Sequence, residues 1–403
     1  MRAAVHAARS VVGQPPIDDV VLAQYRFEPC ADARPRLNFV IDNLTAASMF
    51  GGVKTGIDIV VNLAWKLDRH APELRLILTN PNSASDAELF LQQAARIGID
   101  PATITVVKVT SRDQAIAVRA RDLFITYNWW TTLNIAPLLQ TQADHFGQAI
   151  KPLIYLIQEY EPHMMPFSSG LNLAREAYDT PQRLWGVFNS SNLYDYFRLQ
   201  GHQAEREFTF EPVVNARLRP YLRNVAESAR ERRILVYGRP GIPRNCFPAL
   251  LRGLRRWAVD YPESAQWDVV SAGTAHKDYP LGNGRSLRSV GKLSLDDYAG
   301  MLLGSSVGVS LMSSPHPSYP PLEMAHFGLR TITNSFMCKA LEGYHPDLVA
   351  LSSIQEHALS AAIAQACERH GEPRERSPNA DYVREEAYPF LADLAHGIAQ
   401  EWN

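Results

Sequence analysis

Short apolar runs alternate with amphipathic stretches along most of this chain. In the first half, runs typical of buried strands lie at residues 37–42, 74–79, 104–109, 122–127, 152–158 and 184–189. Amphipathic stretches at 53–69 and 86–97 have the periodicity of helices that bury one face. Strands that are apolar on both sides and alternate with helices indicate a parallel sheet covered by helices on both faces.

The same alternation begins again in the second half, after a charged segment at 217–231 that contains Pro220. It predicts strands at 234–237, 267–270, 287–290, 307–311 and 330–333, and helices at 245–259, 294–303 and 321–327. At 403 residues the chain exceeds the size at which one core stops growing. We therefore predict an α/β protein with two Rossmann-like, doubly wound parallel-sheet domains that face each other across a cleft. The predicted segments are an extension at 1–36, domains at 37–216 and 217–380, and a C-terminal helical segment at 381–403.

Composition narrows the classes of function. The chain is 46% hydrophobic and 20% charged, as ordinary globular proteins are, and its net charge of −2 does not favour nucleic acid as a partner. The four cysteines lie far apart without a C-x-x-C pair, so we expect reduced thiols and no zinc site. No stretch is typical of a signal peptide or a membrane span, and we expect a cytoplasmic protein.

Two glycines stand between the first strand and the first helix. Open α/β sheets bind ligands at the carboxyl ends of their strands, and Gly51 and Gly52 occupy such a position. Glycines there let the backbone approach a phosphate and leave amides available at the helix start. The segment matches neither the dinucleotide nor the P-loop fingerprint. A plain tight turn is the alternative interpretation.

Two cations follow strands of the second half. Arg239 comes after the strand at 234–237, within Y-G-R-P-G, and Lys292 comes after the strand at 287–290. A guanidinium binds phosphate oxygens in bidentate fashion, and an ammonium acts as a point charge. Either side chain alone could simply be solvated. Together, at equivalent strand ends, they predict a clamp for a diphosphate.

The most informative segment runs from Ser313 to Gly328, after the strand at 307–311. Prolines at 320 and 321 suit the first turn of a helix, so Ser318 and Tyr319 are predicted at its N-terminus, where an anion is favoured. Glu323 falls in the first turn and could accept hydrogen bonds from ribose hydroxyls. The alternatives are a packed aromatic for Tyr319 and a carboxylate that only complements the helix dipole for Glu323.

The first half offers a different set of groups. Y-L-I-Q-E-Y-E-P-H at 155–163 places Glu159, Glu161 and His163 at a strand end, where they could orient acceptor hydroxyls or transfer protons. Trp129, in Y-N-W-W-T-T, could stack on a sugar. Solvated loop charges and a core tryptophan are the alternatives. No metal-binding motif or nucleophile motif is present, so we predict metal-independent chemistry.

These segments resemble the GT-B glycosyltransferases of family 4. The glycine loop and S-Y-P-P-L-E-M-A-x-x-G at 318–328 carry the general resemblance. More closely, F-G-G-V-x-T at 50–55, Q-E-Y-E-P at 158–162, Y-G-R-P at 237–240 and P-H-P-S-Y-P-P-L-E at 315–323 are similar to bacterial WsaF-type rhamnosyltransferases. The resemblance covers about residues 36 to 400.

The resemblance implies a donor of the dTDP-β-L-rhamnose type and no cofactor. By position, Arg239 and Lys292 would bind the diphosphate, and Tyr319 and Glu323 the nucleoside and ribose. Gly51 and Gly52 would close over the diphosphate from the acceptor domain, and the C-terminal helix would cross back to that domain. The family retains anomeric configuration without a metal. The acceptor would be a growing bacterial surface glycan, and a lipid-linked acceptor with peripheral contact at the inner membrane stays open.

One position departs from the family. Members of family 4 usually carry E-x7-E, and here Glu323 matches the second carboxylate while Pro315 stands in place of the first. By the resemblance, WsaF-type sequences share this loss. Two other functions remain open. The chain could be a nucleotide-sugar epimerase, which needs no acceptor, or a non-catalytic scaffold in a glycan-assembly complex. The acceptor, the linkage and the oligomeric state are not predicted.

Overall fold

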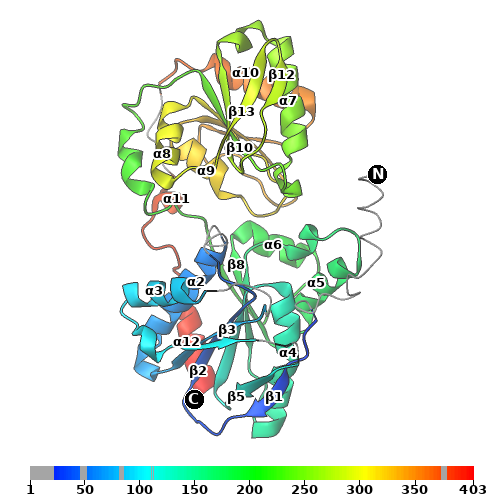
Figure 1. The fold of residues 1–403 in the computed structure, drawn as a ribbon, viewed down its shortest axis with the longest axis vertical. Helices are drawn as coiled ribbons and strands as arrows, with labels where there is room; N and C mark the ends of the chain where they lie inside the picture. The colour runs from blue at the N-terminus through cyan, green and yellow to red at the C-terminus, as the bar shows by residue number, and fades with distance from the viewer. Residues whose placement is uncertain (1–21, 46–51, 81–85, 110, 112, 374–378) are drawn as a thin grey trace, which may run out of the picture. The chain divides into compact units, whose positions relative to one another are not determined.

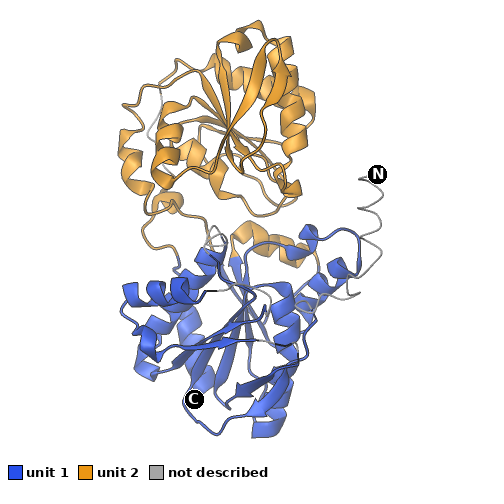
Figure 2. Cartoon of the chain, in the orientation of Figure 1, with its two compact units in different colours: residues 1–188, 201–209, 388–403 blue, residues 189–200, 210–387 orange. Residues whose placement is uncertain are grey.

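The computed structural model describes residues 22–45, 52–80, 86–109, 111, 113–373 and 379–403. The chain divides into two compact units, shown in blue and orange in Figure 2. Unit 1 comprises residues 1–188, 201–209 and 388–403, and unit 2 comprises residues 189–200 and 210–387. The sequence placed the domain boundary between residues 216 and 217, whereas the two units divide between Thr209 and Phe210. The chain returns to unit 1 at Tyr388.

Unit 1 is built on a seven-stranded sheet (Figure 1). In spatial order its strands are β4 (Thr105–Lys108), β3 (Glu73–Leu78), β2 (Arg36–Ile41), β6 (Asp122–Thr126), β7 (Leu153–Ile157), β8 (Leu184–Asn189) and β9 (Arg206–Phe210). The pairs from β4 through β8 are all parallel. Every residue of β2, β6, β7 and β8 is buried, as the uninterrupted apolar runs predict.

Helices cover this sheet on both faces. Among its described residues, unit 1 has the helices α2 (Gly52–Lys66), α3 (Glu88–Arg96), α4 (Trp129–Phe146), α5 (Ser169–Asp179) and α12 (Leu391–Trp402). On one face, Val40 and Phe124 pack with Leu139 of α4. Phe39, the neighbour of Val40 on β2, faces the other way and stacks on Phe90 of α3 at 6.0 Å between ring centroids. Successive strand residues thus serve opposite faces.

Part of the predicted N-terminal extension belongs to this unit. β1 (Arg26–Pro29) lies inside the segment 1–36 and pairs in parallel with β5 (Ala115–Val118) as a separate two-stranded sheet. Tyr25 is buried with Ile116 in the core beside α4. Residues 26–29, inside the segment predicted as an N-terminal extension, therefore form a strand of unit 1. The sequence analysis predicted no strand there, because a strand this short, with alternating charged positions, leaves no apolar run to detect.

Buried ion pairs hold the amino-terminal edge of the unit 1 sheet. Asp122 is fully buried at the start of β6, and the Arg36 guanidinium donates to both of its oxygens at 2.8 and 2.6 Å. Arg75 lies 3.7 Å from the same carboxylate, and Arg119 pairs with Glu73. Because each charge meets an opposite one, we regard these arginines as structural.

Unit 2 contains a second seven-stranded sheet. In spatial order its strands are β12 (Tyr279–Gly282), β13 (Arg285–Gly291), β11 (Asp268–Gly273), β10 (Arg233–Gly238), β14 (Val307–Val309), β15 (Arg330–Asn334) and β16 (Leu348–Leu351). The pairs from β13 to β16 are parallel, whereas β12 is antiparallel to β13. The sequence analysis predicted no strand at β12, which pairs at this edge through a hairpin at Asn283 and Gly284 that reverses the chain.

Two pairs of helices cover the faces of this second sheet. The helices of unit 2 are α6 (Ser191–Leu199), α7 (Phe247–Asp260), α8 (Leu295–Gly304), α9 (Tyr319–His326), α10 (Glu356–Glu368) and α11 (Ala380–Val383). Ile234 and Val236 of β10 pack with α7 and α10, whereas Leu235 between them packs with α8 and α9. Both units therefore have the predicted doubly wound architecture, in which loops gather at the carboxyl ends of the parallel strands.

Candidate active site

Arg239 and Lys292 lie at the same edge of the unit 2 sheet. Arg239 follows the last residue of β10, and Lys292 follows the last residue of β13, with β11 between them. At the end of β11, a Cβ added to Gly273 would lie 3.3 Å from Cγ of Arg239 and 2.4 Å from the Gly238 oxygen. The stem of Arg239 therefore crosses a glycine at the strand end between the two cations.

The surroundings of Arg239 leave its charge unneutralised. Its half-buried guanidinium has no carboxylate partner among the residues that the structure describes, and Lys292 is exposed to solvent. A fixed cation without an opposite charge attracts an anion. The two predicted clamp residues thus lie at the same edge of the unit 2 sheet, as their positions directly after strands predict.

The loop before α9 is buried along most of its length. It runs from Ser310 to Ser318, and the helix begins at Tyr319, slightly earlier than the sequence predicts. Ser318 has a left-handed backbone, with φ 70°, and its N–H donates to Nδ1 of His316 at 2.9 Å. The amide of Ser318, predicted to favour an anion, is therefore occupied by an imidazole.

Two further cations lie close to this loop. Burial lowers the pKa of His316 to about 3, and the charges of Lys339 and Arg244 lower it further. Lys339 is fully buried, and its Nζ donates to the carbonyl of Met312 at 2.7 Å. The sequence analysis assigned no role to these three residues. The only available signal was the position of His316 next to Pro315.

Glu323 lies next to buried tyrosine side chains. Tyr298 of α8 donates its hydroxyl to Oε2 of Glu323 at 3.0 Å. Burial raises the pKa of Glu323 to about 7, although the hydrogen bond from Tyr298 opposes that rise. Tyr382 of α11 is fully buried nearby, and its hydroxyl has no partner among the described residues. Tyr298 and Tyr382 thus both lie near the carboxyl of Glu323, and Tyr298 occupies Oε2.

In unit 1, Gly51 lies outside the described residues, and Gly52 is the first residue of α2. A Cβ added to Gly52 would lie 2.6 Å from the hydroxyl of Tyr127, at the end of β6. Close packing on Tyr127 therefore requires a glycine at position 52 whether or not a phosphate binds there. Burial, together with the nearby charges of Glu161 and Asp42, raises the pKa of Tyr127.

Glu161 is the best-supported acid–base group of unit 1. Tyr155 donates its hydroxyl to Oε2, the backbone N–H of Trp129 donates to the same carboxylate, and Tyr178 accepts the backbone N–H of Glu161 at 3.2 Å. Burial raises the pKa of Glu161 to about 8 despite these bonds. A carboxyl that titrates near neutral pH suits general acid or base catalysis.

Asp42 is a second carboxyl in this region. It follows β2 directly and accepts hydrogen bonds from Asn128 at 3.1 Å and Asn43 at 2.7 Å. Burial raises its pKa, and its charge contributes to the raised pKa of Glu161. The sequence analysis gave Asp42 no role. Its position as the last residue of the first predicted strand, at 37–42, is the signal that could have identified it.

The other predicted residues of unit 1 lie differently. Glu159 is 8% exposed and turns back to accept the backbone N–H of Tyr160 at 3.1 Å. His163 is largely exposed to solvent, and its ring packs edge-on against Tyr160 at 4.9 Å between centroids. The partial burial of that ring lowers the pKa of His163. Glu159 is therefore held by the backbone, whereas His163 remains accessible to a ligand.

Trp129 does not form the exposed platform that the sequence suggested. It is 3% exposed, at the start of α4, and packs against Ala174 and Ala177 of α5. Its ring meets that of Trp130 edge-on at 5.4 Å. Trp129 is a core residue, and the prediction that its side chain stacks on an acceptor is wrong. Its backbone N–H instead serves Glu161.

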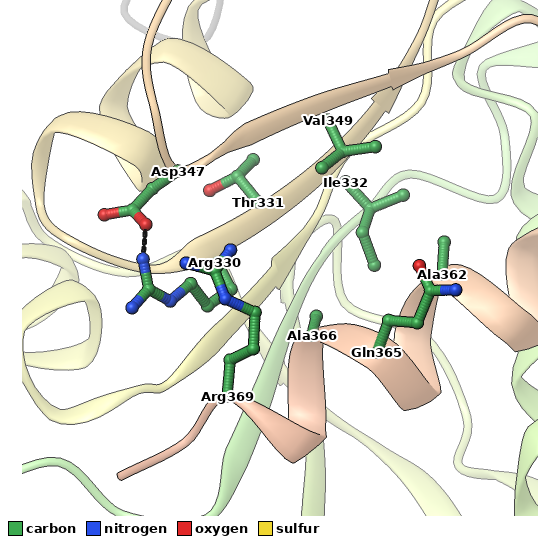
Figure 3. Close-up of a pocket in the computed structure, with 9 residues that line it drawn as sticks. All are labelled: Arg330, Thr331, Ile332, Asp347, Val349, Ala362, Gln365, Ala366 and Arg369. Carbon is green, nitrogen blue, oxygen red and sulfur yellow. Dashed lines mark ion pairs between the residues drawn. The ribbon is translucent and has the colours of Figure 1, made fainter. Parts of the chain in front are cut away.

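A pocket in unit 2 is lined by residues of β15, β16, α10 and the segments next to them, with Arg330 and Asp347 at the amino ends of the two strands (Figure 3). Its charged lining is internally paired, because Arg330, the first residue of β15, forms an ion pair with Asp347 and a hydrogen bond with Glu372 at 3.1 Å. Arg369 also donates to Glu372, at 2.7 Å. These charges are satisfied within the protein, and we assign them a structural role.

The described part of the chain contains no group of three or more His, Cys, Asp or Glu side chains placed to hold a metal ion. All four cysteines lie in that part and are free thiols. None of its helices combines the length and the apolar character that crossing a bilayer requires.

Two helix-covered parallel sheets in one chain define the GT-B fold. Solved structures with a similar fold match nearly the whole length of this chain. Anabaena HepE in complex with UDP is 13% identical, with a TM-score of 0.57 over 91% of this chain and 98% of that one. The lipopolysaccharide outer core galactosyltransferase WaaB is 12% identical, with a TM-score of 0.56 over 91% and 99%. At this identity the likeness shows the fold alone.

Sequence comparison identifies the family. Residues 36–191 match the WsaF N-terminal domain and residues 232–364 match the WsaF C-terminal domain. Because the two matches together cover more than two thirds of the chain, this protein belongs to the WsaF family. It is also 26% identical over 287 residues to the O-antigen biosynthesis protein RfbC of Myxococcus xanthus. The match spans 71% of this chain but only 21% of that longer relative.

Proposed function

We propose that this protein is a glycosyltransferase that builds a bacterial surface polysaccharide such as an O-antigen. It moves a sugar from a nucleoside diphosphate donor to a growing glycan, which could be carried on a lipid. The observation that supports this most directly is the edge of the unit 2 sheet. There Arg239, Lys292 and the N-terminus of α9 follow three strands of one sheet, with Glu323 in the helix that follows.

These groups fit the parts of a nucleotide sugar. Arg239 and Lys292 neutralise the diphosphate as it leaves, so the cations of the protein supply the charge and no metal is required. Glu323 accepts a ribose hydroxyl through Oε1. The WsaF family match and the motif at 315–323 favour dTDP-β-L-rhamnose as the donor, with retention of anomeric configuration.

Unit 1 supplies the groups for the acceptor. With a pKa of about 8, Glu161 is partly ionised near neutral pH and accepts the proton of the acceptor hydroxyl. His163 is exposed beside it in sequence and orients the acceptor. Gly52 lets α2 begin directly against Tyr127. We therefore assign proton transfer to unit 1 and donor binding to unit 2.

A panel of nucleotides tests this proposal. A ligand that binds only the folded protein raises its melting temperature by mass action. We expect dTDP and dTDP-sugars to raise it more than UDP, GDP and their sugars do. If no member of the panel raises the melting temperature, the proposal fails.

Substitution of the clamp residues tests the assignment more sharply. Arg239→Ala and Lys292→Ala should each weaken dTDP binding by about 1.5–3 kcal/mol, the range of a hydrogen bond to a charged group. Arg252→Ala is a matched control, since Arg252 is an exposed arginine of α7 paired with Glu356. Titration calorimetry measures all three. Unchanged affinity in both clamp variants would remove these residues from the donor site.

A non-catalytic scaffold is the second candidate, because Pro315 stands where the E-x7-E motif of glycosyltransferase family 4 has its first glutamate. A scaffold has no need for a diphosphate clamp. Incubation of the purified protein with dTDP-β-L-rhamnose, with and without acceptor glycan, separates the two. Release of dTDP supports the transferase, whereas tight dTDP binding without release or transfer supports the scaffold.

A further inference from the structure

A single polar atom stands out in the loop before α9. Nε2 of His316 is buried and has no hydrogen-bond partner among the described residues. The residue is only 5% exposed, and its ring centroid lies 5.8 Å from that of Tyr319, the first residue of the helix. A buried polar atom without a partner is unfavourable, and it commonly marks a place where a ligand completes the bonding.

The position of the ring proton follows from the hydrogen bonds. Nδ1 of His316 accepts the backbone N–H of Ser318 at 2.9 Å, so it carries no proton. The neutral imidazole therefore holds its proton on Nε2. Burial and the charges of Lys339 and Arg244 keep the ring neutral. His316 thus presents one N–H donor, and it needs an acceptor.

The helix that follows offers fewer donors than a helix start normally does, because only Tyr319 among positions 318–321 keeps a backbone N–H not used by His316. The first four N–H groups of a helix have no partner inside the helix and can bind an anion. In α9, however, Pro320 and Pro321 carry no N–H, and the N–H of Ser318 is already bonded to His316. The imidazole N–H therefore stands where backbone amides are missing.

We propose that Nε2–H of His316 donates a hydrogen bond to the sugar-side phosphate of the bound nucleotide sugar. The proposal rests on the proposed function, since it deepens the same donor site. An anionic oxygen is the expected acceptor because Lys339 and Arg244 make the surroundings of the ring positive. His316 acts as a binding residue for the leaving group, and it transfers no proton.

Two substitutions separate the two ring nitrogens. In His316→Asn the amide oxygen lies near the place of Nδ1, so it can still accept from Ser318 while the distal donor is lost. In His316→Gln the longer amide restores a donor near the place of Nε2. We expect His316→Asn to weaken dTDP binding by about 10-fold to 100-fold, as loss of a hydrogen bond to a charged group does. His316→Gln should recover part of this loss.

The ligand series thymidine, dTMP and dTDP locates the contact. If Nε2–H reaches the sugar-side phosphate, His316→Asn weakens binding of dTDP but leaves the affinities for thymidine and dTMP within about twofold. His357→Asn is the control, because His357 is an exposed histidine of α10 in the same unit. Equal losses for all three ligands would indicate a structural role and overturn the assignment.

A spectroscopic measurement does not depend on the variants. In the ¹⁵N-labelled wild-type protein, the imidazole of His316 should show a protonated Nε2 and an unprotonated Nδ1, and saturating dTDP should shift the Nε2–H resonance. No shift of this resonance on binding overturns the assignment and leaves the proposed function standing. If neither dTDP, UDP nor GDP binds the wild-type protein, both proposals fail.

Discussion

Glu161 of unit 1 and Glu323 of unit 2 lie in similar surroundings. Each is a glutamate whose carboxyl accepts a tyrosine hydroxyl, from Tyr155 and Tyr298 respectively. In each, burial raises the pKa, to about 8 for Glu161 and about 7 for Glu323. The two halves of the fold therefore hold a carboxyl in nearly the same way.

The cations make the difference between the units. In unit 2, Arg239 and Lys292 follow strands at the same edge as the loop before Glu323. In unit 1, Arg36 and Arg75 lie at the opposite edge of the sheet from Glu161, and both serve Asp122. Under the proposed function, the placement of arginine and lysine makes unit 2 the anion site and leaves proton transfer to unit 1.

The largest expected effect concerns the carboxyl of unit 1. Glu161→Gln should lower the rate of sugar transfer by about 10²-fold to 10⁴-fold, the usual contribution of a general base, and leave dTDP affinity unchanged. In the wild type, only the ionised carboxyl accepts a proton, so the rate should rise with pH through about 8, and this rise should vanish in the variant.

The control for this experiment is Glu207→Gln, a substitution at an exposed glutamate of β9. Stability offers a second readout. Because the folded pKa is raised above the ordinary 4.5, the folded state holds more protons between about pH 4.5 and 8, and the contribution of Glu161 to stability falls as pH rises through that window. Glu161→Gln should flatten this dependence. An unchanged pH–stability curve would contradict the assigned pKa.

The paired arginines of unit 1 should matter for stability. Asp122→Ala leaves Arg36 and Arg75 buried without their carboxylate, and we expect a loss of about 3–5 kcal/mol in the free energy of unfolding. Chemical denaturation measures it. Asp260→Ala, which breaks an exposed pair with Arg256 on α7, should cost less than about 1 kcal/mol. Similar losses in the two variants would show that the unit 1 arginines are not structural.

A smaller effect is expected at the start of α2. In Gly52→Ala the new methyl group would meet the Tyr127 hydroxyl at 2.6 Å, and such overpacking costs about 1–3 kcal/mol. Tyr127→Phe in the same chain should recover most of the loss by removing that oxygen. Gly300→Ala is the control, because a Cβ at Gly300 in α8 meets open space. Equal stability of Gly52→Ala and Gly300→Ala would exclude the close approach.

The smallest effect concerns the carboxyl of unit 2. Tyr298→Phe removes the hydrogen bond that lowers the pKa of Glu323, so the titration midpoint of Glu323 should rise above about 7. Stability should fall by about 1 kcal/mol, the net value of one hydrogen bond. NMR of the glutamate carboxyl carbon follows the midpoint. A midpoint that falls would show that Tyr298 does not stabilise the ionised form.

Much of the fold could be predicted because buried parallel strands leave uninterrupted apolar runs. The strands predicted at 122–127 and 184–189 match β6 and β8 to within one residue. β1 and β12 escaped, since short edge strands expose alternate residues and carry no such run. A sequence pattern therefore identifies those elements whose buried residues form a regular or continuous series along the chain.

The candidate site was harder to predict. The loops that follow strands could be located in the sequence, and they identified Arg239, Lys292 and Glu161 as candidate site residues. Whether a side chain is exposed depends on packing between distant segments, and that is why Trp129 was misplaced. Asp42 and His316 were overlooked for a related reason, because their importance lies in hydrogen bonds that no local pattern records.

The return of the chain to unit 1 sets an order for its folding. Glu401 of α12 receives two hydrogen bonds from Arg183, at 3.1 and 2.7 Å, and Trp402 is buried. These partners emerge from the ribosome only after residues 210–387 have been synthesised. The first unit must therefore wait, with part of its surface uncovered, until α12 has been synthesised. A chaperone that shields nascent chains would be needed more by the earlier half than by the later one.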